Sequence, residues 1–309
     1  MLNLTVVICT HNRADLLILA IDSIYSAKVP QNCTVGILVV ANACTDDTLR
    51  KVSDYQNQQN TNSYFNINVV EEPNPGKSYA LNHAIRMVKS DYLCFMDDDQ
   101  RLDKSYFIAV SKAIADFSEV TMLCGPLYPD WQGNEPDWIR DTGKYRITPL
   151  PIPEFNLGKE SLDIEKMNQM PPGGQVVIRR DVFDRVGLFA ENLGPTGHNL
   201  VGSEDTDFFI RAIEKGEIFR YFPDIVQYHY IDPARLKLSY LVQNSFQRNR
   251  SLTAITRKSE RIPRYLWSKL IKYFLLSILS FHIKKFRHYL IRTASIMGQI
   301  AGYFNVSRT

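Results

Sequence analysis

The stretch Tyr92-Leu-Cys-Phe-Met-Asp-Asp-Asp99 is an apolar run typical of a buried strand, and it ends directly in three aspartates. Upstream of it, strand-like and helical patterns alternate at residues 4–9, 14–25, 36–40, 67–70 and 78–88. Apolar strands that alternate with helices predict an α/β, Rossmann-like fold with a mostly parallel central sheet covered on both faces. Ligands of such sheets bind beyond the carboxyl ends of the strands, which is where the aspartates are expected.

Asp97, Asp98 and Asp99 concentrate negative charge at this edge. Adjacent carboxylates repel one another when they are partly buried, so such a cluster is typical of a cation site. Because alternate residues of a strand face the same side, we expect Asp97 and Asp99 to bind one metal ion while Asp98 points elsewhere. The alternative is a solvated acidic turn.

The composition is that of an ordinary globular protein, with 309 residues of which 45% are hydrophobic. Its five cysteines are an odd number, and several lie in apolar runs, so we expect no disulfide framework and a reducing, cytoplasmic setting. The first apolar stretch, residues 4–9, is too short for a secretory signal.

Charge divides the chain into two parts. From Arg235 onward there are fifteen Lys and Arg against one acid, Glu260, so this tail carries about +14, whereas residues 1–234 carry −11. We therefore expect a main domain at 1–234. Residues 235–309 are predicted to form a basic, amphipathic helical tail.

The second half of the main domain begins with a proline-rich segment, residues 126–172, that contains Trp131 and Trp138. Flat aromatic side chains on loops are suited to stacking on sugar rings, although both could instead anchor a long loop. A more regular block follows, with a Gly173-Gly174 turn, a strand at 175–178, helices at 181–186 and 204–215, and a strand at 225–227.

A phosphate-binding loop is the competing explanation for Pro75-Gly-Lys-Ser78 followed by the strand that ends in Asp97. That motif needs a glycine five positions before Gly76, and Glu71 stands there. The sequence therefore argues against a nucleoside triphosphatase.

Glu204 and Asp205 open a predicted helix after a glycine-containing loop. Acids in a first helical turn can simply cap the helix. In a sugar transfer, the attacking hydroxyl must lose a proton, and a positioned carboxylate can accept it.

His229 follows the strand-like run at 225–227. A single histidine is more often a hydrogen-bonded structural residue, and only proximity to the aspartates would make it a metal ligand.

The sequence resembles the family 2 glycosyltransferases, which have the nucleotide-diphospho-sugar transferase fold called GT-A. Six blocks carry the resemblance in the expected order across about residues 3–232: Thr5 to Arg13, Val39 to Asp46, Asn74 to Asn82, Phe95 to Asp99, Gly173-Gly174, and Gly202 to Arg211.

The resemblance implies a nucleotide-binding half at 1–125, an acceptor-side half at 126–234 and a role for each matched position. The nucleotide end would involve Thr10, His11 and Arg13, with Asn42 and Lys77 nearby, Asn82 facing the donor, and Asp97 and Asp98 also on the donor side. Asp97, Asp99 and His229 would hold Mn²⁺ or Mg²⁺. Asp205 would be the catalytic base beside Glu204, and Gly173, Gly174, Trp131 and Trp138 would form the acceptor region.

One departure from the family pattern concerns the nucleotide base. Where the family commonly has an aspartate against the base, this sequence has Ala41-Asn42. Amide side chains both donate and accept hydrogen bonds, so Asn42 and Asn82 would tolerate more than one base, with a UDP-sugar as the favoured donor. The family is inverting in nearly all its members, which agrees with a single candidate base.

The tail contains an apolar run from Tyr273 that is too short to span a bilayer of about 30 Å. A helix lying in the membrane interface fits it better, with Trp267, Tyr273 and Phe274 at headgroup level and Lys284, Lys285 and Arg287 facing anionic lipid. Alternatively, the tail packs on the main domain or on a partner chain. No motif accompanies the charge to indicate nucleic-acid binding.

These features predict an inverting, metal-dependent glycosyltransferase at the cytoplasmic face of the cell membrane. It would build a surface polysaccharide or glycolipid on a saccharide or lipid-linked acceptor. The alternative is a catalytically silent member that acts as a membrane scaffold or partner subunit.

Overall fold

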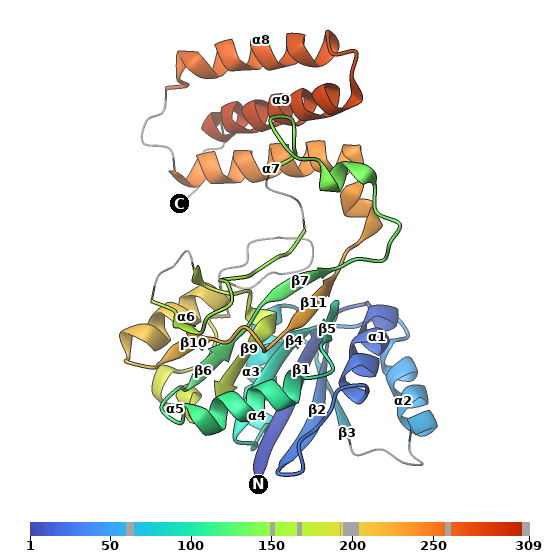
Figure 1. Ribbon diagram of the computed structural model, residues 1–309, viewed down its shortest axis with the longest axis vertical. Helices are drawn as coiled ribbons and strands as arrows, with labels where there is room; N and C mark the ends of the chain where they lie inside the picture. The colour runs from blue at the N-terminus through green and yellow to red at the C-terminus, as the bar shows by residue number, and fades with distance from the viewer. Residues whose placement is uncertain are drawn as a thin grey trace. The chain divides into compact units, whose positions relative to one another are not determined.

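The computed structural model describes residues 1–59, 65–148, 152–165, 169–191, 193, 204–256 and 261–304. The chain forms two compact units. The first, here called the sheet unit, comprises Met1–Asp130 and Pro153–Tyr230, and the second, the helical unit, comprises Trp131–Ile152 and Ile231–Thr309 (Figure 1).

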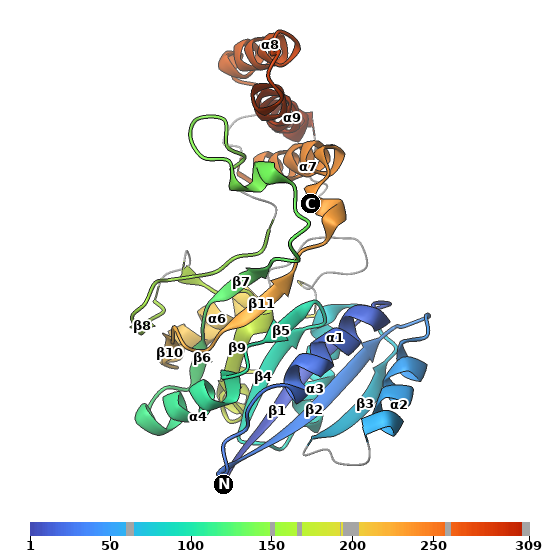
Figure 2. The ribbon, with the colours of Figure 1, turned by 45° about the vertical axis from the view of Figure 1, so that its right-hand side comes forward.

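An eight-stranded sheet forms the centre of the sheet unit. Its strands, in spatial order, are β3 (Asn66–Glu72), β2 (Cys33–Asn42), β1 (Leu2–Thr10), β4 (Tyr92–Asp97), β9 (Val176–Arg179), β6 (Met122–Cys124), β10 (Phe219–Tyr221) and β8 (Leu162–Asp163). All neighbours are parallel except β9, which is antiparallel to β4 and β6, and β8, which is antiparallel to β10. Figure 2 shows β1 to β4 side by side. The predicted α/β class and mostly parallel sheet are confirmed.

The strand register sets which side chains meet at the carboxyl edge. Cys9 pairs with Asp97 and Thr10 with Ala41, so β1, β2 and β4 end together. Chain order reverses at β1, between β2 and β4, and this switch point is where open α/β sheets bind their ligands. Because β9 runs the opposite way, its start, preceded by the 3₁₀ turn Gly173–Gln175, lies at the same edge.

Helices cover both faces of the sheet. α1 (Ala14–Tyr25), α2 (Thr48–Gln59) and α4 (Tyr106–Asp116) pack in one apolar core, which receives Leu4, Val6 and Ile8 of β1. α3 (Lys77–Met87), α5 (Val182–Val186) and α6 (Glu204–Glu214) pack in the other, which receives Val7. This alternation along β1 is what a strand buried on both faces requires.

A second sheet of three strands carries the predicted histidine. It consists of β5 (Gln100–Leu102), β11 (Gln227–Tyr230) and β7 (Leu127–Asp130). The strand expected at 225–227 in fact spans Gln227–Tyr230, so His229 lies within it, opposite Gln100. The backbone N–H of Tyr230 donates to the carbonyl of Asp99 at 2.8 Å, which fixes this strand beside the aspartates.

The helical unit contains α7 (Leu238–Thr256), α8 (Arg264–Ile278) and α9 (Ile283–Phe304), with 3₁₀ turns at Asp137–Arg140 and Pro233–Leu236. Gly298 lets α9 approach the backbone of α7, since a Cβ there would overlap the carbonyl of Phe246. The helical C-terminal extension is confirmed. Within the described residues, every helix is either too short or too polar to cross a membrane.

Residues 131–152 belong to the helical unit, although residues 153–230 of the sheet unit separate them from the rest of it in the sequence. Trp138 packs in a small core with Ile152, Ile231, Leu236 and Leu241. Contacts therefore group this segment with the tail, whereas the sequence suggested one continuous acceptor-side half at 126–234.

Candidate active site

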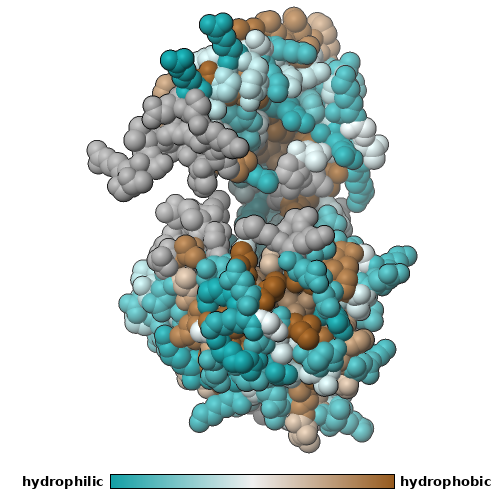
Figure 3. Space-filling model, turned by 90° about the vertical axis from the view of Figure 1, so that its left-hand side faces the viewer, coloured by the Kyte–Doolittle hydropathy of each residue, from teal (hydrophilic) through white to brown (hydrophobic). Residues whose placement is uncertain are grey.

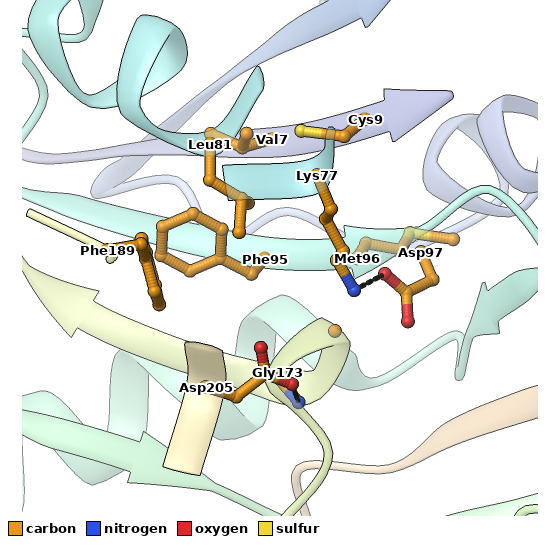
Figure 4. A pocket seen from close by; sticks show the side chains of 11 residues that line it. Val7, Cys9, Lys77, Leu81, Phe95, Met96, Asp97, Gly173, Phe189 and Asp205 are labelled. Atoms are coloured by element: carbon orange, nitrogen blue, oxygen red, sulfur yellow. Dashed lines mark hydrogen bonds and ion pairs between the residues drawn. The ribbon is translucent and has the colours of Figure 1, made fainter. Parts of the chain in front are cut away.

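Asp97, at the end of β4, forms an ion pair with Lys77, the first residue of α3. The distance from Lys77 Nζ to Asp97 Oδ1 is 2.7 Å. Burial raises the pKa of Asp97, but Lys77 outweighs it and the net pKa is lowered. Burial lowers the pKa of Lys77, but Asp97 and Asp205 outweigh it and the net pKa is raised. Both side chains are therefore charged, and Lys77 lies between carboxylates from two different elements (Figure 4).

Asp98 is buried and faces away from this ion pair. Its carboxylate accepts hydrogen bonds from Thr10 Oγ1 at 2.8 Å and from an Arg13 guanidinium nitrogen at 3.1 Å. Arg13 also contacts Asp99 at 3.1 Å. Burial, together with the charge of Asp99, raises the pKa of Asp98 to about 6 despite these partners. Asp98 thus ties β4 to the end of β1, with Thr10 and Arg13 as its partners.

Asp99 contacts His229 at the carboxyl edge of the sheet. His229 Nε2 lies 3.3 Å from Asp99 Oδ1, and both side chains are nearly buried. His229 Nδ1 lies 2.7 Å from the carbonyl oxygen of Tyr230. A carbonyl only accepts, so Nδ1 carries the proton and Nε2 of a neutral ring presents a lone pair to the carboxylate. Such a contact is favourable only when a cation, either a proton or a metal ion, lies between the two atoms.

Gly173 and Gly174 lie against two carboxylates from distant parts of the sequence. The N–H of Gly173 donates to Asp205 Oδ2 at 2.8 Å. A Cβ at Gly173 would overlap the carboxylate of Asp205, and one at Gly174 would overlap that of Asp97. Glycine is therefore required at both positions for Asp97 and Asp205 to approach the same turn.

Asp205 and Glu204 begin α6. Asp205 Oδ1 is buried and has no hydrogen-bond partner among the described residues. Glu204 is 2% exposed, and burial, followed by the charge of Asp205, raises its pKa to about 7. The preceding residues of the predicted motif, Gly202 and Ser203, lie outside the described part of the chain. This pair thus places a carboxyl whose pKa is raised to about 7 beside the carboxylate of Asp205, whose Oδ2 is held by Gly173.

Asn42 and Asn82 have structural partners. The amide of Asn42 donates to the carbonyls of Glu72 and Asn74 and accepts from the N–H of Gly76. Asn82 exchanges two hydrogen bonds with the backbone of Phe189 and donates to Glu191. These hydrogen bonds hold loops in place, and the roles expected of Asn42 near the nucleotide and of Asn82 facing the donor stay predictions.

His11 and Asn12, which follow β1, contact the end of β2 and the loop after it, and of the two only His11 had been predicted. His11 bonds the carbonyl of Asn42 at 2.7 Å. Its neighbour Asn12 has a positive φ of 53°, and Asn12 Oδ1 accepts from the N–H groups of Thr45 and Asp46. Asparagine tolerates this backbone conformation well, and its place between a strand and a helix was the signal available in the sequence.

Figure 4 shows a pocket between the Asp97–Lys77 ion pair and Asp205. Its lining combines the charged residues Lys77, Asp97 and Asp205 and the two glycines with an apolar wall of Val7, Cys9, Leu81, Phe95, Met96 and Phe189. Phe189 had not been predicted. Trp131, which is exposed, and Trp138, which lies buried under the Arg287 guanidinium, belong to the helical unit.

A metal ion would find two of its expected ligands together. Asp99 and His229 are adjacent, whereas Asp97 is engaged by Lys77. Among the described residues, no group of three His, Cys, Asp or Glu side chains lies ready to hold a metal ion. Completion of such a site would need a further ligand or the release of Asp97 from Lys77.

Comparisons with known proteins agree with this architecture. Succinoglycan biosynthesis protein ExoM of Rhizobium meliloti (strain 1021) is 21% identical over 271 residues, which are 86% of this chain and 79% of that protein. The crystal structure of S. aureus TarS 1-349 superposes with a TM-score of 0.57 at 15% identity, over 98% of this chain and 91% of TarS.

A mannosyltransferase from Pyrobaculum calidifontis, PcManGT, solved with GDP-Man and Mn²⁺, also has a TM-score of 0.57 at 15% identity, over 97% of this chain and 85% of its own. At these identities the structural likeness shows the fold alone, which is GT-A. The model of glycosyl transferase family 2 matches residues 5–187, more than half of the sequence. The chain therefore belongs to glycosyl transferase family 2.

Proposed function

We propose that this glycosyltransferase moves a sugar, with inversion, from a nucleoside-diphosphate donor to an acceptor hydroxyl, and that Asp205 is the catalytic base. The observation that carries the proposal is the Gly173-Gly174 turn, which holds Asp205 on one side and the Asp97–Lys77 ion pair on the other. A base and a charged group that can contact a diphosphate thus lie around one small pocket.

The two oxygens of Asp205 have different tasks. Oδ2 is oriented by the N–H of Gly173, which leaves Oδ1 to accept the proton of the attacking hydroxyl. A single base is what direct displacement at C1 requires, and this supports inversion. Lys77, whose raised pKa keeps it charged, is the cation in reach of a departing diphosphate.

A divalent cation fits the Asp99–His229 pair. His229 presents Nε2 to Asp99 while Nδ1–H is held by a backbone carbonyl, the arrangement that orients histidine ligands of metals. The 3.3 Å between the two ligand atoms is close to the ~3 Å expected for neighbouring ligands of an octahedral ion bound at about 2.1 Å. When bound, Mn²⁺ or Mg²⁺ would neutralise negative charge on the diphosphate. Asp97 would be its third ligand.

A UDP-sugar is the proposed donor. TarS has been solved with UDP-GlcNAc, and PcManGT with GDP-Man, so the fold accommodates both bases. In this chain, neither Asn42 nor Asn82 has a free amide with which to select between them. The choice of UDP rests on the sequence resemblance, and a panel of UDP, GDP and dTDP in a thermal-shift assay with Mn²⁺ tests it.

The proposed acceptor is a saccharide or a lipid-linked saccharide in the synthesis of a cell-surface polysaccharide or glycolipid. The relative named for succinoglycan biosynthesis supports this class. The proposed location is the cytoplasmic face of the cell membrane, as a peripheral protein.

The deciding experiment replaces the base. Asp205→Asn keeps the size of the side chain but removes its basicity, and we expect transfer to fall by about 10²- to 10⁴-fold with little change in donor affinity. Asp207→Asn, two residues further along α6, is the matched control, because Asp207 pairs with Arg211 outside the pocket. Near-normal transfer by the Asp205 variant would remove the base assignment.

A further inference from the structure

α8 has apolar side chains on two faces. On its inner face, Leu266, Leu270 and Tyr273 pack in a core with Ile296 and Ile300 of α9. These contacts account for the folding of α8 onto the helical unit. They leave the rest of its apolar surface uncovered.

The outer face of α8 carries a stripe of exposed large side chains. Trp267, Ile271, Phe274 and Ile278 recur every three or four residues and are 47–63% exposed. Leu275 and Leu279 widen the stripe, and Phe281 and Ile283 extend it beyond the end of the helix. Figure 3 shows hydrophobic surface at the upper edge of this unit. Single exposed apolar residues are ordinary, but a contiguous stripe of this length marks an interaction surface.

Positive charge surrounds this stripe. Residues 261–304 contain eight Lys and Arg and no Asp or Glu: Arg261, Arg264, Lys269, Lys272, Lys284, Lys285, Arg287 and Arg292. Lys269 and Lys272 are exposed on α8 itself, and Lys285 is exposed at the start of α9. At 100° per residue, Lys272 borders the stripe beside Leu279, and Lys269 lies about 60° further round the helix.

This charge distinguishes between two possible occupants. A second copy of the chain, docked about a twofold axis, would bring the same basic flanks together without an acid on these helices to neutralise them. An anionic lipid surface provides both the apolar layer and the opposite charge. α8 has 15 residues, about 22 Å of helix, which is less than the bilayer core, so it fits the plane of the interface.

We propose that the outer face of α8, from Trp267 to Phe281, docks flat on an anionic lipid surface, with Lys272 at the headgroups and Lys269 reaching them through its long side chain. Trp267 and Phe274 lie at the depth of the interface, where aromatic rings are favoured. This inference deepens the proposed peripheral location by naming the surface responsible, and it involves no residue of the pocket.

The test uses the full chain and vesicles of phosphatidylcholine, with or without phosphatidylglycerol, in a sedimentation assay without donor. We expect wild type to bind the anionic vesicles. Ile271→Gln/Phe274→Gln should bind them more weakly by a factor on the order of ten or larger, since glutamine keeps the helix but removes apolar area. Ile108→Gln, at a similarly exposed position of α4, is the matched control and should bind as wild type does.

A second arm separates charge from apolar insertion. Lys269→Gln/Lys272→Gln should weaken binding to anionic vesicles and reduce its salt dependence. Transfer to a water-soluble acceptor without vesicles should remain as in wild type for both double variants, which shows that they fold and keeps this test separate from that of Asp205. The proposal is overturned if wild type does not bind, if the α8 variants bind equally well, or if wild type forms a dimer without lipid that Ile271→Gln/Phe274→Gln abolishes.

Discussion

Gly174→Ala is predicted to damage catalysis far more than folding. Gly174 begins the approach to β9 and lies against the carboxylate of Asp97, which a Cβ would overlap. To restore ordinary van der Waals separation, the carboxylate must move by about 1 Å. Asp97 would then lose the 2.7 Å contact with Lys77, and the two charges that line the pocket would no longer be held in register.

The magnitude follows from this displacement. A shift of about 1 Å in a positioned catalytic group costs about 10²-fold in rate, so we expect kcat/KM for sugar transfer to fall by about 100-fold. Overpacking at a single site costs about 1–3 kcal/mol, so the variant should still be folded at 25 °C. Steady-state kinetics with the preferred donor, beside a thermal denaturation curve, measure both quantities.

Gly36→Ala is the matched control for this variant. Gly36 lies in β2, and a Cβ there would meet Thr5 Oγ1 at 3.8 Å, which is ordinary contact. We expect it to keep wild-type kinetics. If Gly174→Ala stayed within about threefold of wild type, the position of Asp97 would not limit transfer and the reasoning from the turn would be refuted.

Three further predictions concern burial and charge. Asp141→Ala should destabilise the helical unit by about 3 kcal/mol, since it leaves the nearly buried Arg287 without its carboxylate; urea denaturation measures this, and adding Arg287→Leu should recover part of the loss. The raised pKa of Glu204, about 7 against an ordinary 4.5, means that the folded state holds a proton that the unfolded chain has released, so stability falls as pH rises through this window. Glu204→Gln should flatten that slope in thermal denaturation, and an unchanged slope would contradict it. His229→Ala should weaken Mn²⁺ binding by about 10-fold or more in titration calorimetry without nucleotide, whereas His83→Ala, at the His83–Glu72 pair, should not.

The sequence was sufficient for the parts of the fold with strong local signals. The helix expected at 14–25 and the strand ending in the aspartates match α1 and β4 closely, because both are continuous or periodic apolar patterns. α2 was missed because it is polar along most of its length, and its only buried apolar side chains are Val52 and Tyr55. α4 has a regular buried face, but no helix was predicted there from the sequence.

The hydrogen bonds of Asn42 and Asn82 were not predicted from the sequence because they are long-range contacts. The amides of Asn42 and Asn82 looked available for a nucleotide, but their partners lie about 30 and 107 residues away and are mostly backbone groups. Such partners leave no pattern near the asparagine itself. The same holds for residues 131–152, whose tryptophan packs against side chains more than 90 residues later in the chain.

The charges of the site explain why a metal ion belongs to the proposed reaction. Around the edge, the described residues contribute five carboxyl groups from Asp97 to Asp99 and from Glu204 to Asp205, against the two cations Arg13 and Lys77. Burial is the main cause that raises the pKa of Asp98 to about 6 and that of Glu204 to about 7, and the charge of a neighbouring carboxylate raises both further. A diphosphate would add more negative charge to the same space, which Lys77 alone cannot neutralise while it is bound to Asp97. Donor binding and metal binding are therefore expected to be mutually dependent, with His229 Nε2, which faces Asp99, as a ligand of the cation.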